Sequence, residues 1–483
     1  MGHERGLRVV AAALVAGIVS VTAVTSAHAE PGPLPVVPVV SSHPKGDDVR
    51  DHEYWLDELG IRSAWKQTTG KGVKVAVIDT GVDGNHQDLT GNVESGKDVS
   101  KGGTSDGWKP VGAEPEHGTL VASMIAGHGH EGRDANKAPK GEPGHGAGVI
   151  GIAPEASIVP ISAWLGTQNP GGVAVEDQIP RAVREAVDSG AKVINLSVGS
   201  SKTDWPESWD QAFEYAQDHD AVVVASAGNR GSGVTQVGAP STIPGVLSVG
   251  GVDRQGKASW DSSAQGISIA VAAPSEDLIG AMPENKYGLW SGTSASAPMV
   301  SGVLALMRQK YPDESSAQII KRLIDTAKDQ GPPGRDPQYG YGVVDPMAAL
   351  TRDEDVSGVR DNPLGSVAAW AKIHRRADPT DEPSDPPAEE HTVGEKIDPV
   401  AAPEAAPGPH VNLLLPIGLI AAVAGWMWLL AAGTVARLRR ILGSPPHPPR
   451  RVLAEYLGLG KRGRNSQGVL EDQRSTDFWG RRQ

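Results

Sequence analysis

The 483-residue sequence predicts an α/β fold in which a parallel β-sheet lies between two layers of helices, followed by one C-terminal transmembrane helix. Short runs that are apolar throughout recur along residues 51–352, as expected of parallel strands buried on both faces. Segments with helical periodicity separate several of these runs, and this alternation is typical of a parallel sheet. An uncharged apolar run near the C-terminus predicts the transmembrane helix.

The strands and helices are assigned in chain order from these patterns. Buried strands are predicted at residues 73–78, 157–161, 192–196, 221–226 and 246–249, and 267–272 is a further candidate. Helices are predicted at residues 177–189, 208–218 and 294–311. About 300 residues are enough for one such domain, and the Gly-rich segment 127–148 is expected to interrupt it as a polar loop.

The N-terminus has the pattern of a secretory signal peptide. A short charged start precedes the apolar run 9–24, and the small residues around His28 form a cleavage site after Ala29. We therefore assign residues 1–29 to a signal peptide, with an uncleaved signal anchor as the alternative. Residues 30–50, rich in Pro and Val, are expected to form an extended arm.

The C-terminal part predicts a single bilayer crossing. As a helix, the apolar run 411–432 would be about 33 Å long, which matches one bilayer. Arg437, Arg439 and Arg440 follow it, so the positive-inside rule places the basic tail 437–483 in the cytoplasm. We assign 411–436 to the transmembrane helix and predict a single-pass cell-membrane protein with its large N-terminal part outside. A buried core helix is the alternative.

Composition excludes several classes of protein. The chain has 45 Lys and Arg against 58 Asp and Glu, and this net charge of −13 argues against a nucleic-acid partner. It has no cysteine, which excludes disulfides, thiolate metal sites and a Cys nucleophile.

Residues 353–410 are rich in Pro, Asp, Glu and Ala, and we interpret them as a linker between the folded domain and the membrane.

Three segments place reactive side chains at the ends of predicted core elements. Asp79 ends a buried strand, His117 opens an apolar helix, and Ser294 opens a helix of small residues. Each could be an ordinary turn or cap residue. Together they can meet at one edge of a parallel sheet, where acyl transfer needs a serine nucleophile, a histidine base and a carboxylate that stabilises the imidazolium.

These segments, in the order Asp, His, Ser, resemble the subtilisin family of serine peptidases. The resemblance covers residues 51–350, and the string 292–298 is its most specific part. It implies a subtilisin-like three-layer domain and a serine endopeptidase that forms an acyl-enzyme. Asp79 would orient His117, His117 would be the general base and acid, and Ser294 the nucleophile.

Two more segments extend the resemblance. The first, 225–229, implies that Asn229 donates to the oxyanion, with a plain turn residue as the alternative. The second, 195–199, resembles the Ser-x-Gly edge whose backbone pairs with an extended substrate in this family. A structural strand end is its alternative. The implied substrate-binding residues are Ser197, Val198 and Gly199.

No cofactor or metal is predicted. Asp88 falls where many subtilisin relatives bind calcium, but the segment 127–148 replaces the partner loop. That segment contains His128, His130 and His145, so a metal site is the alternative to a solvated loop.

The order of segments along the whole chain resembles the mycosins, the membrane-anchored subtilases of type VII secretion systems. Segments 318–327 and 339–351 resemble that group as well, whereas the lack of cysteine departs from it. The arm 30–50 is too short for a folded inhibitory domain. The resemblance implies a membrane-anchored extracellular endopeptidase with peptide or protein substrates and secretion-system membrane components as partners. A mainly structural secretion component and a stand-alone cell-surface protease are the alternatives.

Overall fold

The computed structural model describes residues 37–38, 48–131 and 143–375. The chain divides into two units, Met1–Ser384 and Asp385–Gln483, and all described residues belong to the first. The predicted signal peptide, transmembrane helix and cytoplasmic tail lie outside the described residues, as do most of the arm and part of the linker. Within the described ranges, no helix is both long and apolar enough to cross a membrane.

A seven-stranded sheet forms the centre of the fold, and all its strand pairs are parallel. Its spatial order is β10 (Ile269–Pro274), β9 (Leu247–Val252), β8 (Val222–Ser226), β7 (Val193–Leu196), β2 (Lys74–Asp79), β6 (Ser157–Ser162) and β3 (Lys97–Asp98). The predicted parallel sheet is confirmed, and every predicted strand overlaps an observed one. The reason is burial, because β7 to β10 have no exposed residue and so carry no polar alternation.

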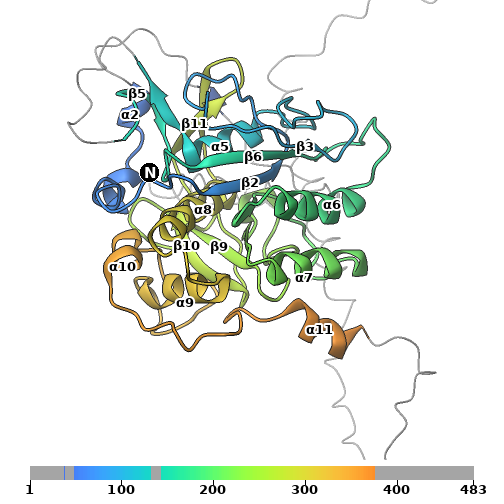
Figure 1. Ribbon diagram of the computed structural model, residues 1–483, viewed down its shortest axis with the longest axis vertical. Helices are drawn as coiled ribbons and strands as arrows, with labels where there is room; N and C mark the ends of the chain where they lie inside the picture. The colour runs from blue at the N-terminus through green and yellow to red at the C-terminus, as the bar shows by residue number, and fades with distance from the viewer. Residues whose placement is uncertain (1–36, 39–47, 132–142, 376–483) are drawn as a thin grey trace, which may run out of the picture. The chain divides into compact units, whose positions relative to one another are not determined.

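Helices cover both faces of this sheet, as predicted. Alternate residues of β2 face opposite sides: Val75 and Val77 pack into one core cluster, and Ala76 and Ile78 into the other. The first cluster contains α5 (His117–Ala126) and α8 (Thr293–Lys310), and the second contains α6 (Val175–Asp188) and α7 (Asp210–Asp218). In Figure 1, α6 and α7 lie together to the right of β9, with α9 and α10 to its left.

Two antiparallel sheets add to the parallel one. Strands β11 (Leu278–Met282) and β12 (Lys286–Trp290) form a hairpin, and β1 (Val37–Pro38) pairs with β12. Strands β4 (His128–His130) and β5 (Ala147–Ile150) pair with each other. The segment 127–148, predicted as a loop, is therefore paired at both ends. The β11–β12 hairpin was not predicted from the sequence, because its turn has left-handed φ at Glu284 (65°) and Asn285 (58°) in place of the usual Asn-Gly.

Shorter elements complete the described chain. They are α2 (Asp48–Asp51), α3 (Trp55–Glu58), α4 (Ile61–Ala64), α9 (Ser316–Thr326), α10 (Pro346–Thr351), α11 (Val367–His374) and the 3₁₀ turns η2 (Glu207–Trp209) and η3 (Arg230–Ser232). Helix α9 starts with a capping box in which Ser315 and Gln318 satisfy each other's backbone N–H groups.

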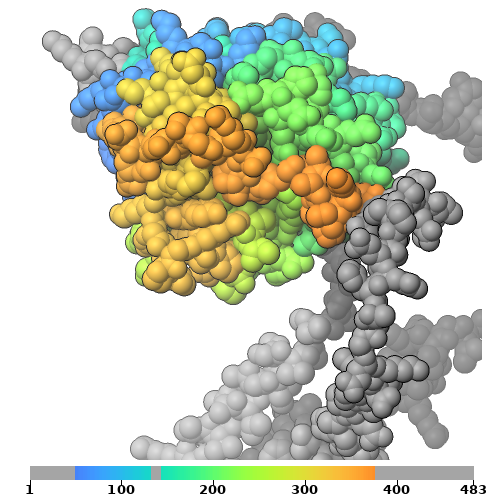
Figure 2. Space-filling model, turned by 60° about the horizontal axis from the view of Figure 1, so that its bottom comes forward, coloured from blue at the N-terminus to red at the C-terminus, as the bar shows by residue number. Residues whose placement is uncertain are grey.

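The folded chain continues past residue 352, where the sequence analysis placed the end of the domain. Val356 and Val367 are buried, and α11 packs against α7. The Arg375 guanidinium donates to the Asp210 carboxylate (2.9 Å). Figure 2 shows these last described residues, in orange, lying across the surface against the green segments. The part of the predicted linker up to Arg375 thus belongs to the folded unit.

Candidate active site

The carboxyl end of β2 carries a buried carboxylate that holds a histidine. Asp79 is fully buried. Its Oδ1 and Oδ2 lie 2.8 and 3.0 Å from His117 Nδ1, and its Oδ1 also accepts a hydrogen bond from the Thr80 N–H (2.7 Å). Because both oxygens face Nδ1, the imidazole is held with Nδ1 protonated and Nε2 turned away from the carboxylate.

The start of α5 is fitted closely to the end of β2. The Thr80 hydroxyl accepts a hydrogen bond from the Gly118 N–H (3.0 Å) and so serves as a cap for a helix that has no side-chain N-cap of its own. A Cβ on Gly118 would lie 2.1 Å from the Gly81 carbonyl oxygen. Only glycine allows this approach, which brings His117 within hydrogen-bond distance of Asp79.

Two opposing effects set the pKa of His117. Burial lowers the pKa, since it disfavours the charged imidazolium. The negative charge and hydrogen bond of Asp79 raise it, with a smaller contribution from Glu114 and Glu116, and the net pKa lies above the ordinary value of 6.5. The site is therefore arranged to stabilise a proton on this ring.

Ser294 occupies the first turn of α8, a helix that is buried along most of its length. Residues 295–308 of α8 are all buried, whereas Ser294 remains partly exposed. Its hydroxyl donates to the Ser197 carbonyl (3.3 Å), and within the described residues it has no hydrogen bond to His117. The structure thus brings Asp79 and His117 together and shows the Ser294 hydroxyl turned toward β7.

A proline in α8 ties Ser294 to the end of β7. Pro298 has no N–H, so the Ser294 carbonyl lacks its usual intrahelical partner four residues on. The Ser197 hydroxyl donates to this carbonyl instead (2.9 Å). Asn195 Nδ2 in turn donates to Ser197 Oγ (2.9 Å), and Ser301 Oγ donates to Asn195 Oδ1 (2.9 Å). This buried chain of hydrogen bonds fixes the backbone of Ser294 relative to the sheet.

Asn229, just beyond β8, has its side chain oriented by the residue before Ser294. Its Oδ1 accepts hydrogen bonds from the Thr293 N–H (2.8 Å) and hydroxyl (3.0 Å). The opposite atom, Nδ2, has no hydrogen-bond partner among the described residues. A Cβ on Gly292 would lie 2.9 Å from Nδ2, so glycine is required there. An oriented donor therefore lies beside Ser294.

The three residues predicted to bind substrate follow the end of β7. This strand lies between β8 and β2, so it is an interior strand of the sheet. The Ser197 side chain points inward to α8, and only its neighbours Val198 and Gly199 are partly or fully exposed. The backbone of Gly199 has no hydrogen-bond partner in the described part of the chain, which leaves it available to an extended peptide.

The Asp88 carboxylate is held by protein donors. It is buried, faces His130 Nδ1 (2.6 Å) and accepts hydrogen bonds from the Val149 N–H (2.8 Å) and the Tyr287 hydroxyl (2.9 Å). The ring nitrogens of His128 lie 2.7 and 2.8 Å from backbone carbonyls. Among the described residues, no three His, Asp or Glu side chains are grouped as metal ligands.

Trp290 contacts the histidine and was missed by the sequence analysis. Its ring lies edge-on to that of His117, with 5.8 Å between centroids, and the residue is only 5% exposed. Trp290 ends β12, four residues before Ser294. It was not identified because the hairpin that contains it was not predicted.

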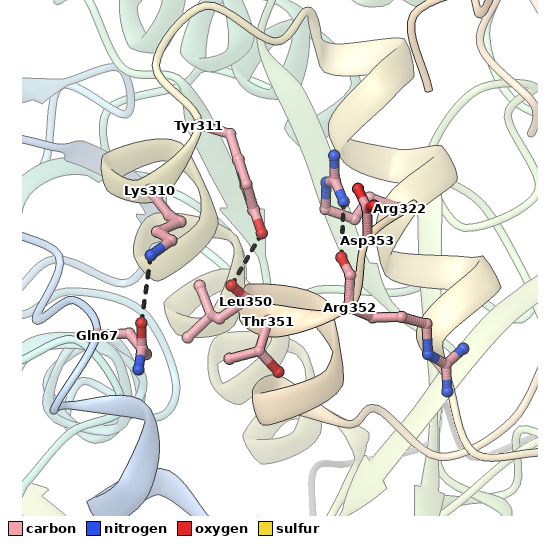
Figure 3. Close-up of a pocket in the computed structure, with 8 residues that line it drawn as sticks. All are labelled: Gln67, Lys310, Tyr311, Arg322, Leu350, Thr351, Arg352 and Asp353. Carbon is pink, nitrogen blue, oxygen red and sulfur yellow. Dashed lines mark hydrogen bonds between the residues drawn. The ribbon is translucent and has the colours of Figure 1, made fainter. Parts of the chain in front are cut away.

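A cavity of about 360 Å³ lies at the far end of α8 from these residues (Figure 3). Ser294 and Lys310 are sixteen residues apart in one helix, a separation of about 24 Å. The cavity's polar groups bond to one another: Lys310 to Gln67 (3.2 Å) and Tyr311 to the Leu350 carbonyl (2.9 Å). The cavity is therefore a junction between elements that is separate from the Asp79–His117 pair.

A parallel sheet with this Asp–His pair at its carboxyl edge, and a serine at the start of a buried helix, is the arrangement of subtilisin-like serine proteases. The chain belongs to the subtilase family, whose sequence profile matches residues 70–342.

Individual relatives agree with this assignment. The chain is 34% identical over 334 residues to fervidolysin of Fervidobacterium pennivorans, and the match covers 63% of this chain but only 44% of that protein. It is 32% identical over 387 residues to mycosin-1 of Mycobacterium tuberculosis, and this match covers 70% of this chain and 80% of mycosin-1. The crystal structure of MycP1 from the ESX-1 type VII secretion system matches with a TM-score of 0.53 and 29% identity. That match covers 70% of this chain and 94% of the MycP1 chain. The chain is thus a subtilisin-like serine protease related to the mycosins.

Proposed function

We propose that this serine endopeptidase cleaves peptide bonds with Ser294 as nucleophile, His117 as general base and acid, and Asp79 as the group that orients His117. The observation that carries the proposal is the buried Asp79 carboxylate bonded to His117 Nδ1. This bond directs Nε2 away from Asp79, where it can accept a proton from a serine hydroxyl.

The reaction begins with a change in the Ser294 side chain. Its hydroxyl leaves the Ser197 carbonyl and donates to His117 Nε2, a bond that commonly tightens only when substrate binds. Ser294 Oγ then attacks the scissile carbonyl carbon as His117 takes the proton. His117 returns that proton to the amine leaving group, and water hydrolyses the acyl-enzyme by the same two steps.

The developing negative charge is stabilised by groups already oriented in the protein. Asn229 Nδ2 donates to the oxyanion, since Thr293 holds the opposite end of that amide. The backbone N–H of Ser294, at the positive end of α8, supports the same charge. Losing one such side-chain donor in this class lowers kcat about 10²- to 10³-fold.

Substrate binding is proposed to use the backbone after β7. An extended peptide can form main-chain hydrogen bonds with Val198 and Gly199, which accommodates many sequences. The Ser197 side chain takes no direct part, because it is engaged with α8.

We further propose that the protease domain acts outside the cell, anchored by residues 411–436 with the tail 437–483 in the cytoplasm. The order of signal, protease domain, acidic linker, apolar run and basic tail in the sequence supports this topology. Relatedness to the mycosins supports an association with membrane components of a type VII secretion system.

Labelling with a fluorophosphonate probe tests the proposed nucleophile. The full-length protein in detergent is compared with Ser294→Ala and with the control Ser291→Ala, which changes a nearby serine outside the site. Labelling of the wild type and control, but not of Ser294→Ala, is expected. Equal absence of labelling in all three folded proteins would contradict the proposal and favour a mainly structural role in a secretion complex.

A further inference from the structure

An arginine and an exposed tryptophan form a platform directly beside Asn229. Arg230 follows Asn229 in the chain, and its guanidinium carbon lies 4.0 Å from the centroid of the Trp260 ring. The same guanidinium donates to the Trp260 carbonyl (3.1 Å). We call these two side chains the Arg230–Trp260 platform.

The backbone around the platform is fixed relative to Asn229. The Gly231 N–H donates to the Asp261 carbonyl (2.8 Å), and the Ala264 N–H donates to the Gly228 carbonyl (2.6 Å). These bonds join the two segments on either side of the platform, so its position does not depend on a single flexible side chain.

Trp260 is unusual in its exposure. The residue is 70% exposed, although tryptophan has one of the largest apolar surfaces available for burial. Tryptophan and arginine are, with tyrosine, the residues most enriched among those that dominate binding energy at protein interfaces. The platform therefore has the composition of a contact surface for a peptide.

Among the described residues, no acid neutralises the charge of the Arg230 guanidinium. No carboxylate of the described residues lies within 4.0 Å of the Arg230 nitrogens, and the neighbouring Asp261 forms no ion pair with it. One of its five N–H groups is used by the Trp260 carbonyl. The remaining donors have no hydrogen-bond partner in the described ranges and can bind a carboxylate in the planar, two-point geometry that arginine favours.

The location limits which part of a substrate can reach the platform. The space enclosed between the two side chains and their neighbours is only about 20 Å³, so a ligand must contact the outer face. Consecutive Cα atoms are about 3.8 Å apart. If Asn229 faces the scissile carbonyl, the Arg230 Cα is about 3.8 Å from the Cα of the residue that binds this carbonyl, a distance shorter than an extended arginine side chain.

We propose that Arg230 is a specificity-determining residue that pairs with an Asp or Glu side chain flanking the scissile bond, while Trp260 packs against the same side chain. This inference rests on the proposed function, because it assumes that Asn229 faces the scissile carbonyl. The ligand chemistry is a peptide carboxylate next to the bond that Ser294 attacks.

Matched peptides test the inference on the full-length protein. Internally quenched peptides differ only in carrying Glu, Gln or Lys at one of the two positions flanking the cleaved bond. The wild type should show a kcat/KM roughly tenfold higher for Glu than for Gln at one of these positions, as expected of one charge-assisted contact. Arg230→Ala should remove this ratio, and Arg230→Glu should reverse it in favour of Lys.

The control is Arg254→Glu, which changes another arginine stacked on an aromatic ring, 4.3 Å from the Tyr54 centroid. It should keep the wild-type preference. Because each preference is a ratio within one variant, a variant with lower total activity still reports it. Cleavage of all peptides without a Glu preference, or a Glu preference that survives in Arg230→Glu, would overturn the inference alone. No cleavage of any peptide by the wild type would overturn the proposed function together with it.

Discussion

Asp79 shows how burial converts an ordinary carboxylate into an orienting group. A fully buried charge is stable only where donors surround it, and here the Thr80 N–H and His117 Nδ1 do so. The cost of burial is offset most fully when His117 carries a second proton, which, at a pH above the pKa of His117, occurs only during the reaction. Asp79 therefore stabilises the charged imidazolium of the reacting state more than the neutral imidazole of the resting enzyme.

Replacing Asp79 by Asn tests this role. The amide would keep the shape of the side chain but would favour the tautomer with Nδ1 unprotonated, leaving Nε2 unable to accept the serine proton. We expect kcat to fall about 10⁴-fold, as for the equivalent change in a serine protease of another fold. The measurement is the steady-state hydrolysis of a peptide at pH 8, with thermal unfolding as the control for folding. A loss of less than tenfold would contradict the orienting role.

The pH dependence of catalysis follows from the pKa of His117. Burial lowers this pKa, but Asp79, Glu114 and Glu116 raise it to a net value above 6.5. His117 must be neutral to act as a base, so activity should be lost as the pH falls through this raised pKa. We expect the acidic limb of kcat/KM to have its midpoint above 6.5, and Glu114→Gln and Glu116→Gln to move it toward lower pH. A midpoint at or below 6.5 would contradict the assignment.

At the scale of elements, α8 and β7 act as one unit. Helix α8 is buried along almost its whole length, which is typical of a helix that crosses the core. The gap that Pro298 leaves in its hydrogen bonds is filled by Ser197 at the end of β7. The nucleophile's backbone is thus fixed by a contact between two elements rather than by the helix alone.

Ser197→Ala tests this connection. The change leaves the Ser294 carbonyl and Asn195 Nδ2 without a partner, and we expect a loss of about 1–3 kcal/mol in the free energy of unfolding. Because the Ser294 backbone loses a restraint, kcat should fall as well. Urea unfolding and peptide hydrolysis measure the two effects. Ser197→Thr, which keeps the hydroxyl, should recover both, and Ser200→Ala, three residues further along the same loop, should change neither.

The same elements show what the sequence could and could not predict. Strands β2 and β6 to β10 were predictable because short runs that are apolar throughout are typical of parallel strands buried on both faces. The pairing of Ser197 with α8 was not, since it arises from a missing N–H at Pro298, 101 positions away along the chain. Ser197 was predicted to bind substrate because segment 195–199 resembles the family's Ser-x-Gly edge, whose backbone pairs with a peptide. Its side chain, which this prediction did not concern, donates to the Ser294 carbonyl. Trp290 was missed because its hairpin lacks the Asn-Gly turn signal.

At the scale of the whole described molecule, the segment after residue 352 joins parts that are distant in sequence. Val356 is buried, and the Gln318 side chain in α9 donates to its carbonyl (3.1 Å). Further along, the Trp370 and Trp205 rings lie 4.5 Å apart. The segment therefore links the α9 side of the domain to the α7 side, as Figure 2 shows. The composition of residues 353–410 as a whole suggested a linker. Pro and acidic residues are concentrated in its later part, so this average hid the folded part before residue 376.

Two substitutions on α11 distinguish a packed segment from a linker. Val367 is fully buried and Ile373, on the same helix, is 62% exposed. If α11 is part of the fold, Val367→Ala should lower the free energy of unfolding of the protease domain by about 2 kcal/mol, because it removes buried methyl groups. Ile373→Ala should change it by less than about 0.5 kcal/mol, as for most surface positions. Denaturant unfolding followed by tryptophan fluorescence measures both, since Trp370 and Trp205 report on the α11–α7 contact. Equal, negligible effects of the two substitutions would place the end of the cooperative domain before α11, at the boundary that composition indicated.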